Sequence, residues 1–286
     1  MPMIDLALYR PFYADEIDAL ADLKTAGLPE ALAFVPREQF LRPGPWAVRG
    51  ENDMRGPRQT KDADPRRVYH NYSIAIDAAR MLFNGAPGVV LPAIDALTLR
   101  PGHRVLHVGA GLGYYSAVMG HVVGSGGRVL AVEVDEGLAR EARDNLASMP
   151  WVELLRGDAA APVAEAFDAI FVSAGVTHPQ PAWLDALAVG GRMVLPLTVT
   201  MPAMGPLGKG FLTLCAKNAD ESFTARPLSM TAIYSGIGLR DESINGQLGQ
   251  AMMRTPFPTF TRLRRDPHDP GPQCWLHATD FCLAVK

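Results

Sequence analysis

Residues 104–115 read Arg-Val-Leu-His-Val-Gly-Ala-Gly-Leu-Gly-Tyr-Tyr, and this stretch decides the fold. The run at 104–108 is rich in β-branched residues and predicts a strand, and residues 114–119 predict a helix. A strand, a glycine turn and a helix open a doubly wound α/β unit. Glycines in such a turn let the backbone approach a ligand closely. The stretch therefore predicts a ligand site at the tip of a buried strand.

A carboxylate follows this turn at the spacing of a ribose-binding acid. A second apolar run at 128–132 ends at Glu133, about 20 residues beyond the turn. A carboxylate can accept hydrogen bonds from both hydroxyls of a ribose. The sequence therefore predicts a pocket for a cofactor that contains adenosine.

The spacing of the glycines indicates which kind of cofactor. A dinucleotide-binding turn has its third glycine after two intervening residues, so that the helix N-terminus can meet a pyrophosphate. Here the glycines stand at the alternate positions 109, 111 and 113, and Tyr114 takes the place of the dinucleotide glycine. This spacing favours a cofactor without a pyrophosphate and argues against a nicotinamide-dependent oxidoreductase.

Residues 105–114 resemble the first motif of S-adenosylmethionine-dependent methyltransferases, most closely the protein-L-isoaspartate O-methyltransferase family, where Gly-x-Gly-x-Gly-Tyr is usual. Residues 35–40, Val-Pro-Arg-Glu-Gln-Phe, are similar to a second motif near the start of that family. Residues 157–159 and 190–196 support the resemblance, which spans roughly residues 30–230 in order. It implies an α/β, Rossmann-like class I methyltransferase fold, with a mostly parallel seven-stranded sheet that contains one antiparallel strand.

The resemblance also implies the cofactor, S-adenosyl-L-methionine, with S-adenosyl-L-homocysteine as the product. The glycine turn would hold its methionine end, Glu133 its ribose, and Asp158 with Ala159 its adenine. The complete set of residues expected to bind the cofactor is Gly109, Ala110, Gly111, Gly113, Tyr114, Glu133, Val134, Asp158 and Ala159.

Residues 81–87 differ from the family pattern. They read Met-Leu-Phe-Asn-Gly-Ala-Pro where the family has Gly-Gln-Thr-Ile-Ser-Gln-Pro. Only Pro87 is retained; Gly85 replaces a serine that presents its hydroxyl to the substrate carboxyl, and Phe83 replaces a threonine. Loss of these donors removes groups that orient a carboxylate for in-line transfer. We therefore expect an acceptor other than isoaspartyl protein, unless Tyr72, Ser73 or Asn84 supplies a replacement donor.

The segment at 173–179 follows the buried run at 167–172 and is expected to face the acceptor, because ligands of open α/β sheets bind beyond the carboxyl ends of the strands. His178 is the candidate catalytic residue: it would act as a base for a hydroxyl or amine acceptor. A carboxylate acceptor is already ionised and needs no base. A purely structural histidine is the alternative. The residues expected to border the acceptor are Asn84, Gly85, Pro87 and Thr177.

The rest of the chain predicts three parts: an N-terminal helical, substrate-side segment (1–95), a cofactor-binding α/β domain (96–228) and a C-terminal extension packed on the core (229–286). The extension could cap the substrate or form a dimer contact. Helices are expected at 13–26, 89–99, 135–149, 181–188 and 243–253, and strands at 128–132, 152–155, 167–172, 192–196, 211–216, 223–228, 230–237 and 274–285.

Composition limits the function classes. With 48% hydrophobic and 20% charged residues and a net charge of −3, the 286-residue chain looks globular and has no basic field for nucleic acid. No apolar run approaches the roughly 20 residues of a membrane span, and residues 1–20 lack a signal-peptide core. The three cysteines show no CxxC spacing and fit no disulfide framework, so we expect no metal and a cytoplasmic location.

The sequence thus predicts an S-adenosylmethionine-dependent methyltransferase, monomeric or homodimeric, with a small-molecule or protein/peptide acceptor. Two alternatives share the cofactor. One is a true protein-L-isoaspartate carboxyl O-methyltransferase that repairs proteins. The other is a non-catalytic binding partner that keeps the cofactor pocket and has lost the acceptor groups.

Overall fold

The computed structural model describes residues 6–50 and 56–285, and the chain forms two compact units. The first unit comprises residues 1–102 and 110–156, and the second comprises residues 103–109 and 157–286. The chain passes from one to the other within the glycine turn, between Gly109 and Ala110. The three-part division expected from the sequence stays a prediction, and the first five residues of the stretch examined for a signal peptide lie outside the described residues.

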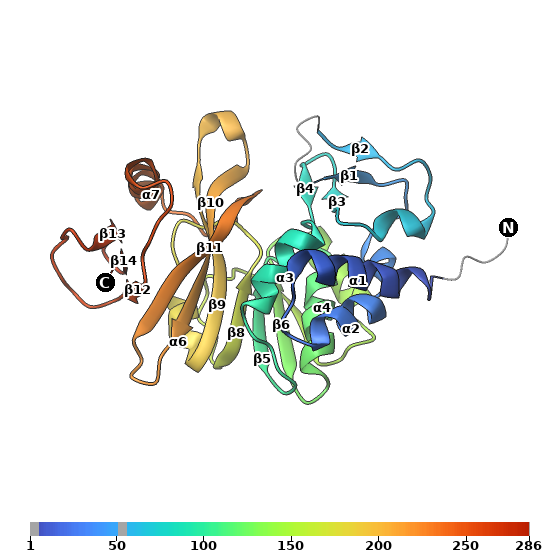
Figure 1. Cartoon of the computed structure of the whole chain (residues 1–286), viewed down its shortest axis with the longest axis horizontal. Coiled ribbons are helices and arrows are strands. Elements are labelled where there is room, and N and C mark those ends of the chain that lie inside the picture. Colours follow the sequence, from blue (N-terminus) through green and yellow to red (C-terminus); the bar gives the residue numbers. More distant parts are fainter. Residues whose placement is uncertain (1–5, 51–55, 286) are drawn as a thin grey trace. The chain divides into compact units, whose positions relative to one another are not determined.

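Five α-helices cover much of the first unit: α1 (Tyr9–Ala21), α2 (Gly27–Phe34), α3 (Pro87–Asp95), α4 (Tyr114–Val123) and α5 (Glu136–Asn145) (Figure 1). Helix α1 packs against α2 and α3, and α2 packs against α4. The helix expected at 13–26 ends earlier, at Asp22, whose backbone is left-handed (φ 50°). Pro29 does not end a helix but lies in the first turn of α2, where its missing N–H removes no helical hydrogen bond.

The first unit contains two groups of strands. Strands β6 (Arg128–Glu133) and β7 (Val152–Arg156) pair in parallel, and α4 and α5 pack against both. A separate four-stranded sheet has the order β2-β1-β3-β4 and is antiparallel throughout. Its strands are β1 (Ala47–Arg49), β2 (Arg58–Gln59), β3 (Ser73–Asp77) and β4 (Leu82–Phe83), and the 3-10 turns η1 (Arg37–Phe40) and η2 (Pro65–Val68) flank them.

A buried arginine ties this small sheet to the helices. Arg37 is 0% exposed, and its Nη1 donates to the carbonyl oxygens of Val68 (2.8 Å) and His70 (2.9 Å), while its Nη2 donates to that of Tyr72 (2.7 Å). Its guanidinium also lies 5.6 Å from the centre of the Tyr114 ring, close enough for a cation–π contact. The Val-Pro-Arg-Glu-Gln-Phe motif therefore holds the segment that leads into β3.

The second unit is built on parallel strands that are buried on both faces. Strand β8 (Phe167–Val172) pairs in parallel with β5 (Arg104–Val108) on one side and with β9 (Leu187–Thr200) on the other. Val108 pairs with Val172, so the carboxyl ends of β5 and β8 lie at the same edge. The short helix α6 (Pro181–Ala186) connects β8 to β9.

Antiparallel strands extend this sheet much further than the sequence predicted. The order within the second unit is β13-β14-β12-β11-β10-β9-β8-β5, and each pairing from β9 to β13 is antiparallel. The α/β class is confirmed, but the expectation of one antiparallel strand is wrong because the extension adds its strands to the same sheet. The strands are β10 (Leu207–Lys217), β11 (Phe223–Tyr234), β12 (Arg262–Arg264), β13 (Cys274–His277) and β14 (Cys282–Ala284).

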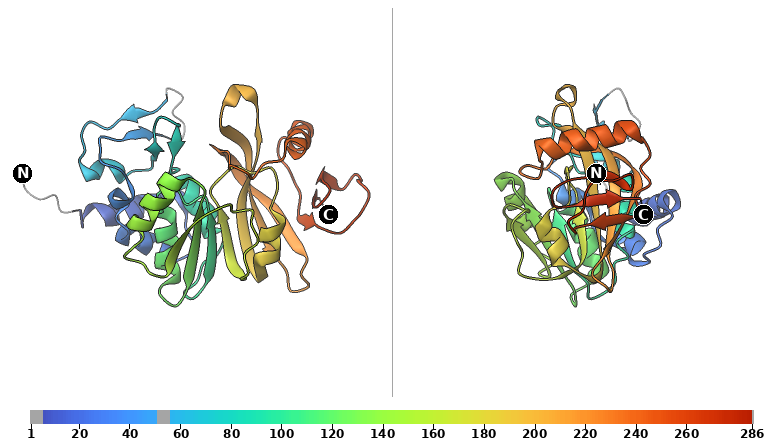
Figure 2. Two further views of the ribbon diagram at one scale, coloured as in Figure 1. Left: turned by 180° about the vertical axis from the view of Figure 1, so that it is seen from behind. Right: turned by 90° about the vertical axis from the view of Figure 1, so that its left-hand side faces the viewer.

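Two segments of the extension fold differently from their sequence patterns. The strand expected at 230–237 is the end of β11, which continues to Tyr234, and the strand expected at 274–285 is the β13–β14 hairpin. Helix α7 (Glu242–Arg254) begins after Asp241, whose side chain accepts from the backbone N–H of Ile244, and it packs against β9 and β13 (Figure 2). None of the helices in the described ranges is both long and apolar enough to cross a membrane.

We predict that Arg37→Lys lowers the free energy of unfolding by about 2–4 kcal/mol, because an ammonium cannot fork to three buried carbonyl oxygens and leaves some of them unpaired. Urea unfolding followed by circular dichroism measures this change. The matched control is Arg42→Lys, whose arginine is half exposed and pairs with Glu141, and which should cost less than about 1 kcal/mol. Equal effects of the two substitutions would contradict the role assigned to Arg37.

Candidate functional site

The glycine turn adopts backbone angles that explain its composition. Gly111 and Gly113 have φ values of +56° and +93°, and Gly113 immediately precedes helix α4. The positive φ favours glycine at position 113, and a Cβ there would also lie close to Cδ1 of Leu146 (3.0 Å). The backbone N–H of Ala110 donates to the carbonyl of Val132 (3.2 Å), which fixes the turn to the end of β6.

Glu133 ends β6 and is only 7% exposed. Its Oε2 accepts from the backbone N–H of Gly111 (2.9 Å), and its Oε1 accepts from that of Asp135 (3.0 Å). Burial raises the pKa of this carboxyl, and the backbone N–H groups oppose that rise. Among the described residues, no arginine or lysine pairs with it. Each oxygen keeps a second lone pair, so the group fits the expected role of accepting from ribose hydroxyls.

Apolar side chains from β3 and α5 pack against the glycine turn. Leu112 is 4% exposed and forms a buried cluster with Ile76 on β3 and Leu138 on α5. A Cβ at Gly111 would lie 3.0 Å from Cδ1 of Ile76, so β3 packs directly against the turn. The role of Ile76 was not predicted, because nothing in the alternating pattern of β3 shows which element its buried face meets. Val134, which follows Glu133, is 41% exposed and offers apolar surface beside the buried acid.

The structure brings residues 84–87 next to helix α4. The hydroxyl of Tyr115 donates to the carbonyl of Gly85 (3.1 Å), and Pro87 begins α3. Asn84 is anchored on Ile74: its backbone N–H donates to the Ile74 carbonyl (3.0 Å), and its Oδ1 accepts from the Ile74 N–H (3.0 Å). Its Nδ2 is buried and has no hydrogen-bond partner among the described residues. Asn84 therefore presents a fixed, unused amide donor.

The two other candidates for a replacement donor, Tyr72 and Ser73, differ from Asn84. The hydroxyl of Tyr72 accepts from Nη2 of Arg58 (2.9 Å) at an exposed position, and Ser73 begins strand β3. Gly85 itself has φ +77°, and a Cβ there would lie 2.7 Å from Cγ2 of Val90. A serine at this position therefore requires a shift of the surrounding chain.

In the second unit, the loop after β8 lies against the end of β5. The backbone N–H of Ser173 donates to the carbonyl of Val108 (2.8 Å), and its Oγ lies 2.9 Å from Nε2 of His107. Burial lowers the pKa of His107 to about 3, so this histidine is neutral and packed, as expected of a core residue. Gly109 approaches the same loop, with its Cβ position 3.5 Å from the backbone carbon of Ser173.

Thr177 and His178 are held by the C-terminal extension. Thr177 is 0% exposed, and its Oγ1 accepts from the backbone N–H of Asp241 (3.0 Å) and lies 2.9 Å from Nδ1 of His178. Nε2 of His178 is 3.3 Å from Nε2 of Gln180, and the ring stacks on Phe281 with 6.1 Å between the ring centres. Burial lowers the pKa of His178. Both ring nitrogens thus have partners, and the catalytic role of His178 stays a prediction.

The turn after β7 carries the two residues expected at the adenine. Arg156, the last residue of β7, pairs with Glu133 in the β6–β7 register, and Asp158 follows two residues later in the chain. The Asp158 side chain is exposed. The carbonyl of Ala159 accepts from the indole Nε1 of the buried Trp183 (2.7 Å), whereas its N–H has no partner within the described part of the chain.

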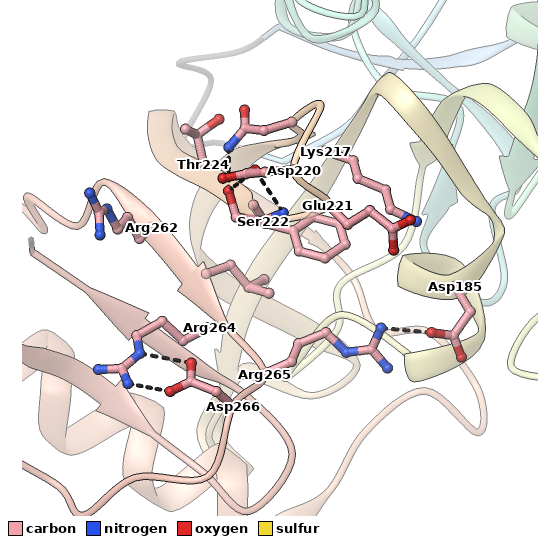
Figure 3. Close-up of a pocket in the computed structure, with 13 residues that line it drawn as sticks. Asp185, Lys217, Asp220, Glu221, Ser222, Thr224, Arg262, Arg264, Arg265 and Asp266 are labelled. Carbon is pink, nitrogen blue, oxygen red and sulfur yellow. Dashed lines mark hydrogen bonds and ion pairs between the residues drawn. The ribbon is translucent and has the colours of Figure 1, made fainter.

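A hollow of about 1100 Å³ in the second unit lies at the amino ends of its parallel strands (Figure 3). It is lined by the β10–β11 turn, residues 262–266 and Asp185, and Nη1 of Arg265 pairs with Asp185 across it (2.6 Å). Ala216 pairs with Arg192 on β9, which pairs with Ala169 near the start of β8, so the turn lies at the amino ends of the parallel strands. Ligands of open α/β sheets bind at the carboxyl ends, so this hollow is not the candidate site.

The sequence of this chain is similar to those of a known protein family. The sequence signature described as "Protein-L-isoaspartate(D-aspartate) O-methyltransferase (PCMT)" matches residues 58–231. A protein-L-isoaspartate O-methyltransferase of Methylorubrum populi is 34% identical over 222 residues, which cover 76% of this chain and 90% of the relative. The chain belongs to the protein-L-isoaspartate O-methyltransferase family. The predicted enzyme class, an S-adenosylmethionine-dependent methyltransferase, and its cofactor are thereby confirmed.

A second relative supports the family, and two solved structures share the fold. The corresponding protein of Methylorubrum extorquens is 34% identical over 226 residues, covering 77% of this methyltransferase and 85% of the relative. A solved protein-L-isoaspartate O-methyltransferase shares the fold with a TM-score of 0.61 at 22% identity, over 89% of this chain and 73% of that one. The crystal structure of a putative protein-L-isoaspartate O-methyltransferase from Plasmodium falciparum, in complex with S-adenosyl-L-homocysteine, matches with a TM-score of 0.58 at 14% identity. The match covers 79% of this chain and 97% of that one.

We predict that Glu133→Gln weakens S-adenosylmethionine binding by about 10- to 100-fold, because hydrogen bonds to a charged acceptor contribute roughly 1.5–3 kcal/mol. Isothermal titration calorimetry measures the affinity. The matched control is Glu153→Gln on β7, an exposed glutamate that pairs with Arg128, and it should leave the affinity unchanged.

The pH dependence of S-adenosylmethionine affinity should also differ between the wild-type protein and Glu133→Gln. The ionised form of Glu133 would accept from both ribose hydroxyls, and burial raises its pKa above the usual 4.5. Affinity should therefore fall on acidification at a higher pH than an ordinary glutamate would give, and the Gln variant should lack this fall. An unchanged affinity and pH profile in Glu133→Gln would contradict the assigned role.

Proposed function

We propose that this chain transfers the methyl group of S-adenosylmethionine to the carboxylate of an isoaspartyl residue in a protein or peptide. The observation that carries the proposal is the family match over residues 58–231, which includes the 81–87 segment, the glycine turn and Glu133. The relatives from both Methylorubrum species have this activity in their names. A carboxylate acceptor is ionised at neutral pH and needs no general base, which agrees with a His178 whose ring nitrogens both have partners.

The proposed cofactor contacts are those expected from the sequence. The turn with Gly111 and Gly113 would bind the methionine end, and the buried carboxylate of Glu133 would accept from the ribose. The N–H of Ala159 and the carboxylate of Asp158 would meet the adenine. When bound, the cofactor supplies a sulfonium-activated methyl group. The protein then has to orient the acceptor and exclude water, since orientation carries much of the rate of an in-line transfer.

We propose Asn84 as the donor that orients the acceptor carboxylate. The family's serine hydroxyl is missing at Gly85, but Asn84 makes two hydrogen bonds to Ile74, one from its backbone N–H and one to its side-chain Oδ1, and its Nδ2 remains unpaired. A buried donor without a partner costs free energy, and a substrate oxygen would satisfy it. This assignment restores isoaspartyl chemistry without the hydroxyl groups that the sequence has lost.

One observation favours a second candidate, a methyltransferase of this family with a different acceptor. Gly85 adopts φ +77° and its Cβ position lies 2.7 Å from Val90, so this segment is built around glycine and not around the family's serine. The same cofactor site would then serve another carboxylate, hydroxyl or amine. A general base such as His178 would be needed for the last two.

The proposal also covers the class of acceptor, the location and the oligomeric state. The acceptor would be a protein or peptide in the cytoplasm and not a nucleic acid, since the net charge of −3 provides no general attraction to phosphates. The enzyme would act as a monomer or a homodimer.

We predict that purified enzyme and methyl-labelled S-adenosylmethionine label a synthetic isoaspartyl peptide, and that the isomeric aspartyl peptide stays unlabelled. The label should be released as methanol in mild base, because a methyl ester hydrolyses whereas N-methyl and ether products do not. Labelling of proteins in a cell extract, with no labelling of the isoaspartyl peptide, would reject the proposed acceptor and favour the second candidate.

We further predict that Asn84→Asp lowers kcat/KM for the isoaspartyl peptide by about 10- to 100-fold with little change in cofactor affinity. The substitution keeps an oxygen that accepts from the Ile74 N–H and replaces the Nδ2 donor with a second oxygen that repels the acceptor. Steady-state kinetics and calorimetry measure the two effects separately. Unchanged kinetics, or a loss confined to cofactor binding, would contradict the role of Asn84.

A further inference from the structure

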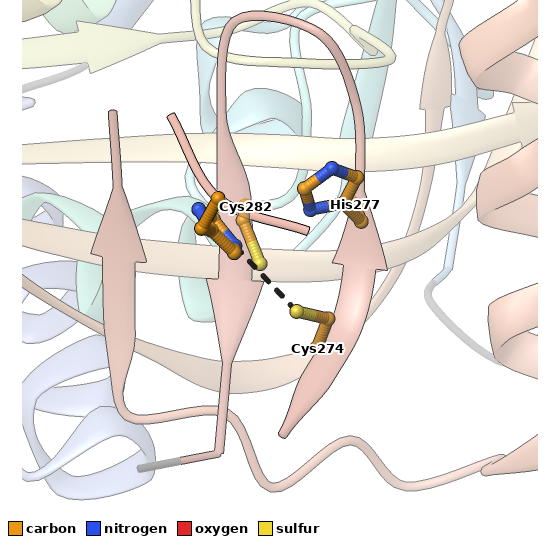
Figure 4. A group of neighbouring side chains, drawn as sticks. Cys274, His277 and Cys282 are labelled. Atoms are coloured by element: carbon orange, nitrogen blue, oxygen red, sulfur yellow. Dashed lines mark hydrogen bonds between the residues drawn. The ribbon is translucent and has the colours of Figure 1, made fainter. Parts of the chain in front are cut away.

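Four side chains capable of binding a metal meet in the C-terminal extension, within the second unit. One is His268, in the loop before β13. The others are Cys274 and His277 at the two ends of β13 and Cys282 at the start of β14 (Figure 4). One potential ligand atom from each lies within 4.8 Å of the other three. The family signature ends at residue 231, so the whole group lies beyond the part of the chain that the family defines.

The spacing of the group matches a tetrahedral zinc site. Zn–S bonds near 2.3 Å and Zn–N bonds near 2.0–2.1 Å place sulfur and nitrogen about 3.6 Å apart and two sulfurs about 3.8 Å apart. The distance from Nε2 of His268 to Sγ of Cys274 is 3.6 Å. The ligand atoms of the other pairs already lie within 4.8 Å of each other, so small side-chain movements would bring them to the distances of a zinc site.

The surroundings of the group are those of metal ligands. Nδ1 of His268 lies 2.8 Å from the carbonyl oxygen of Asp266, and a proton on Nδ1 leaves Nε2 free for a metal, as in most metal-binding histidines. The backbone N–H of Gly271 donates to Sγ of Cys274 (3.4 Å), which stabilises a thiolate. Nδ1 of His277 is buried and has no hydrogen-bond partner among the described residues, a deficit that metal binding through this nitrogen would remove.

We propose that His268, Cys274, His277 and Cys282 bind one Zn²⁺ ion. Two thiolates and two imidazoles in a tetrahedron favour zinc over harder divalent cations. Four protein ligands leave no open position, so the site is structural and not catalytic. The expectation of no metal rested on the missing CxxC pattern. The pattern present is the mixed Cys-x2-His of 274–277, with the other two ligands contributed by a loop and by the neighbouring strand.

The position of the ion explains what it stabilises. Strands β12 and β14 pair over only three residues each, and β13 lies at the edge of the sheet. The ion would join the loop at 265–273 to both strands of the hairpin. Phe281, in the turn of that hairpin, stacks on His178. The metal therefore holds the segment that braces the loop after β8, and its loss should loosen that loop without removing a catalytic group.

Two other states of the cysteines compete with this proposal. Cys274 and Cys282 could form a disulfide, or they could remain thiols that exchange hydrogen bonds with the histidines. A disulfide consumes both thiols and abolishes metal binding, whereas free thiols without metal leave the zinc content at zero. Both states are distinguishable from the zinc site by counting metal and thiols on the same sample.

The test uses the full-length chain purified without chelators. Metal analysis by mass spectrometry should find about one zinc per chain, and replacement by Co²⁺ should give the intense visible bands of a tetrahedral site with thiolate charge transfer. Zinc-free protein with three titratable thiols that takes up no Co²⁺ would overturn the proposal. A Cys274–Cys282 disulfide in peptide mapping of freshly purified, non-reduced protein would overturn it as well.

Variants separate the site from the fold. Cys282→Ser and His268→Asn should each lower Co²⁺ affinity at least 10-fold and change the cobalt spectrum, because each removes one ligand. The matched control is Cys215→Ala, whose cysteine is buried in β10 outside the group and should leave metal content and spectrum unchanged. The loop residue His268 keeps the test decisive should the strand variant fail to fold. Full metal content and an unaltered spectrum in His268→Asn would contradict the assignment.

Discussion

A buried carboxylate held by the backbone of a glycine turn is the contact on which the candidate site depends. Removing a carboxylate from water is costly unless hydrogen bonds replace the lost solvent, and Glu133 finds them in the N–H groups of Gly111 and Asp135. The turn can supply its N–H because glycine accepts a positive φ, and it is kept in place by Leu112, which packs into the apolar cluster beneath it. The first unit thus joins the end of β6 to the turn before α4 through the Gly111–Glu133 hydrogen bond and the hydrogen bond from Ala110 to the Val132 carbonyl.

The N-terminal part of the first unit packs against the same turn and positions Asn84. Arg37 fixes the chain that enters β3, β3 places Ile76 under the turn, and the β3–β4 pair positions Asn84. The family pattern has changed most at 81–87, yet the hydrogen bond from Tyr115 to the Gly85 carbonyl still holds that segment beside α4. Under the proposed function, Asn84 supplies the donor that the family pattern places at residue 85. The C-terminal extension holds the loop after β8 in the second unit. The backbone N–H of Asp241 donates to Thr177, and the ring of Phe281 stacks on His178.

The sequence was informative where function requires unusual local chemistry. Alternating glycines and Glu133 predicted the turn, its adjoining strand and helix, and the cofactor, because these features are encoded within about 30 consecutive residues. The environment of Asn84 could not be predicted, since its partner Ile74 lies ten residues earlier on β3 and the sequence does not show that the two residues are hydrogen-bonded. The β13–β14 hairpin was read as one strand because its turn contains no glycine or proline. The His and Cys group escaped notice for a related reason: its members come together only through that hairpin and a distant loop.

The most direct test of the central claim is a crystal structure of the protein in complex with S-adenosyl-L-homocysteine. We predict that both ribose hydroxyls donate to the Glu133 carboxylate and that the homocysteine end lies against the backbone of residues 109–113. The claim would be contradicted by a nucleoside whose ribose binds away from Glu133, or by a Glu133 carboxylate that accepts hydrogen bonds only from backbone N–H groups in the complex.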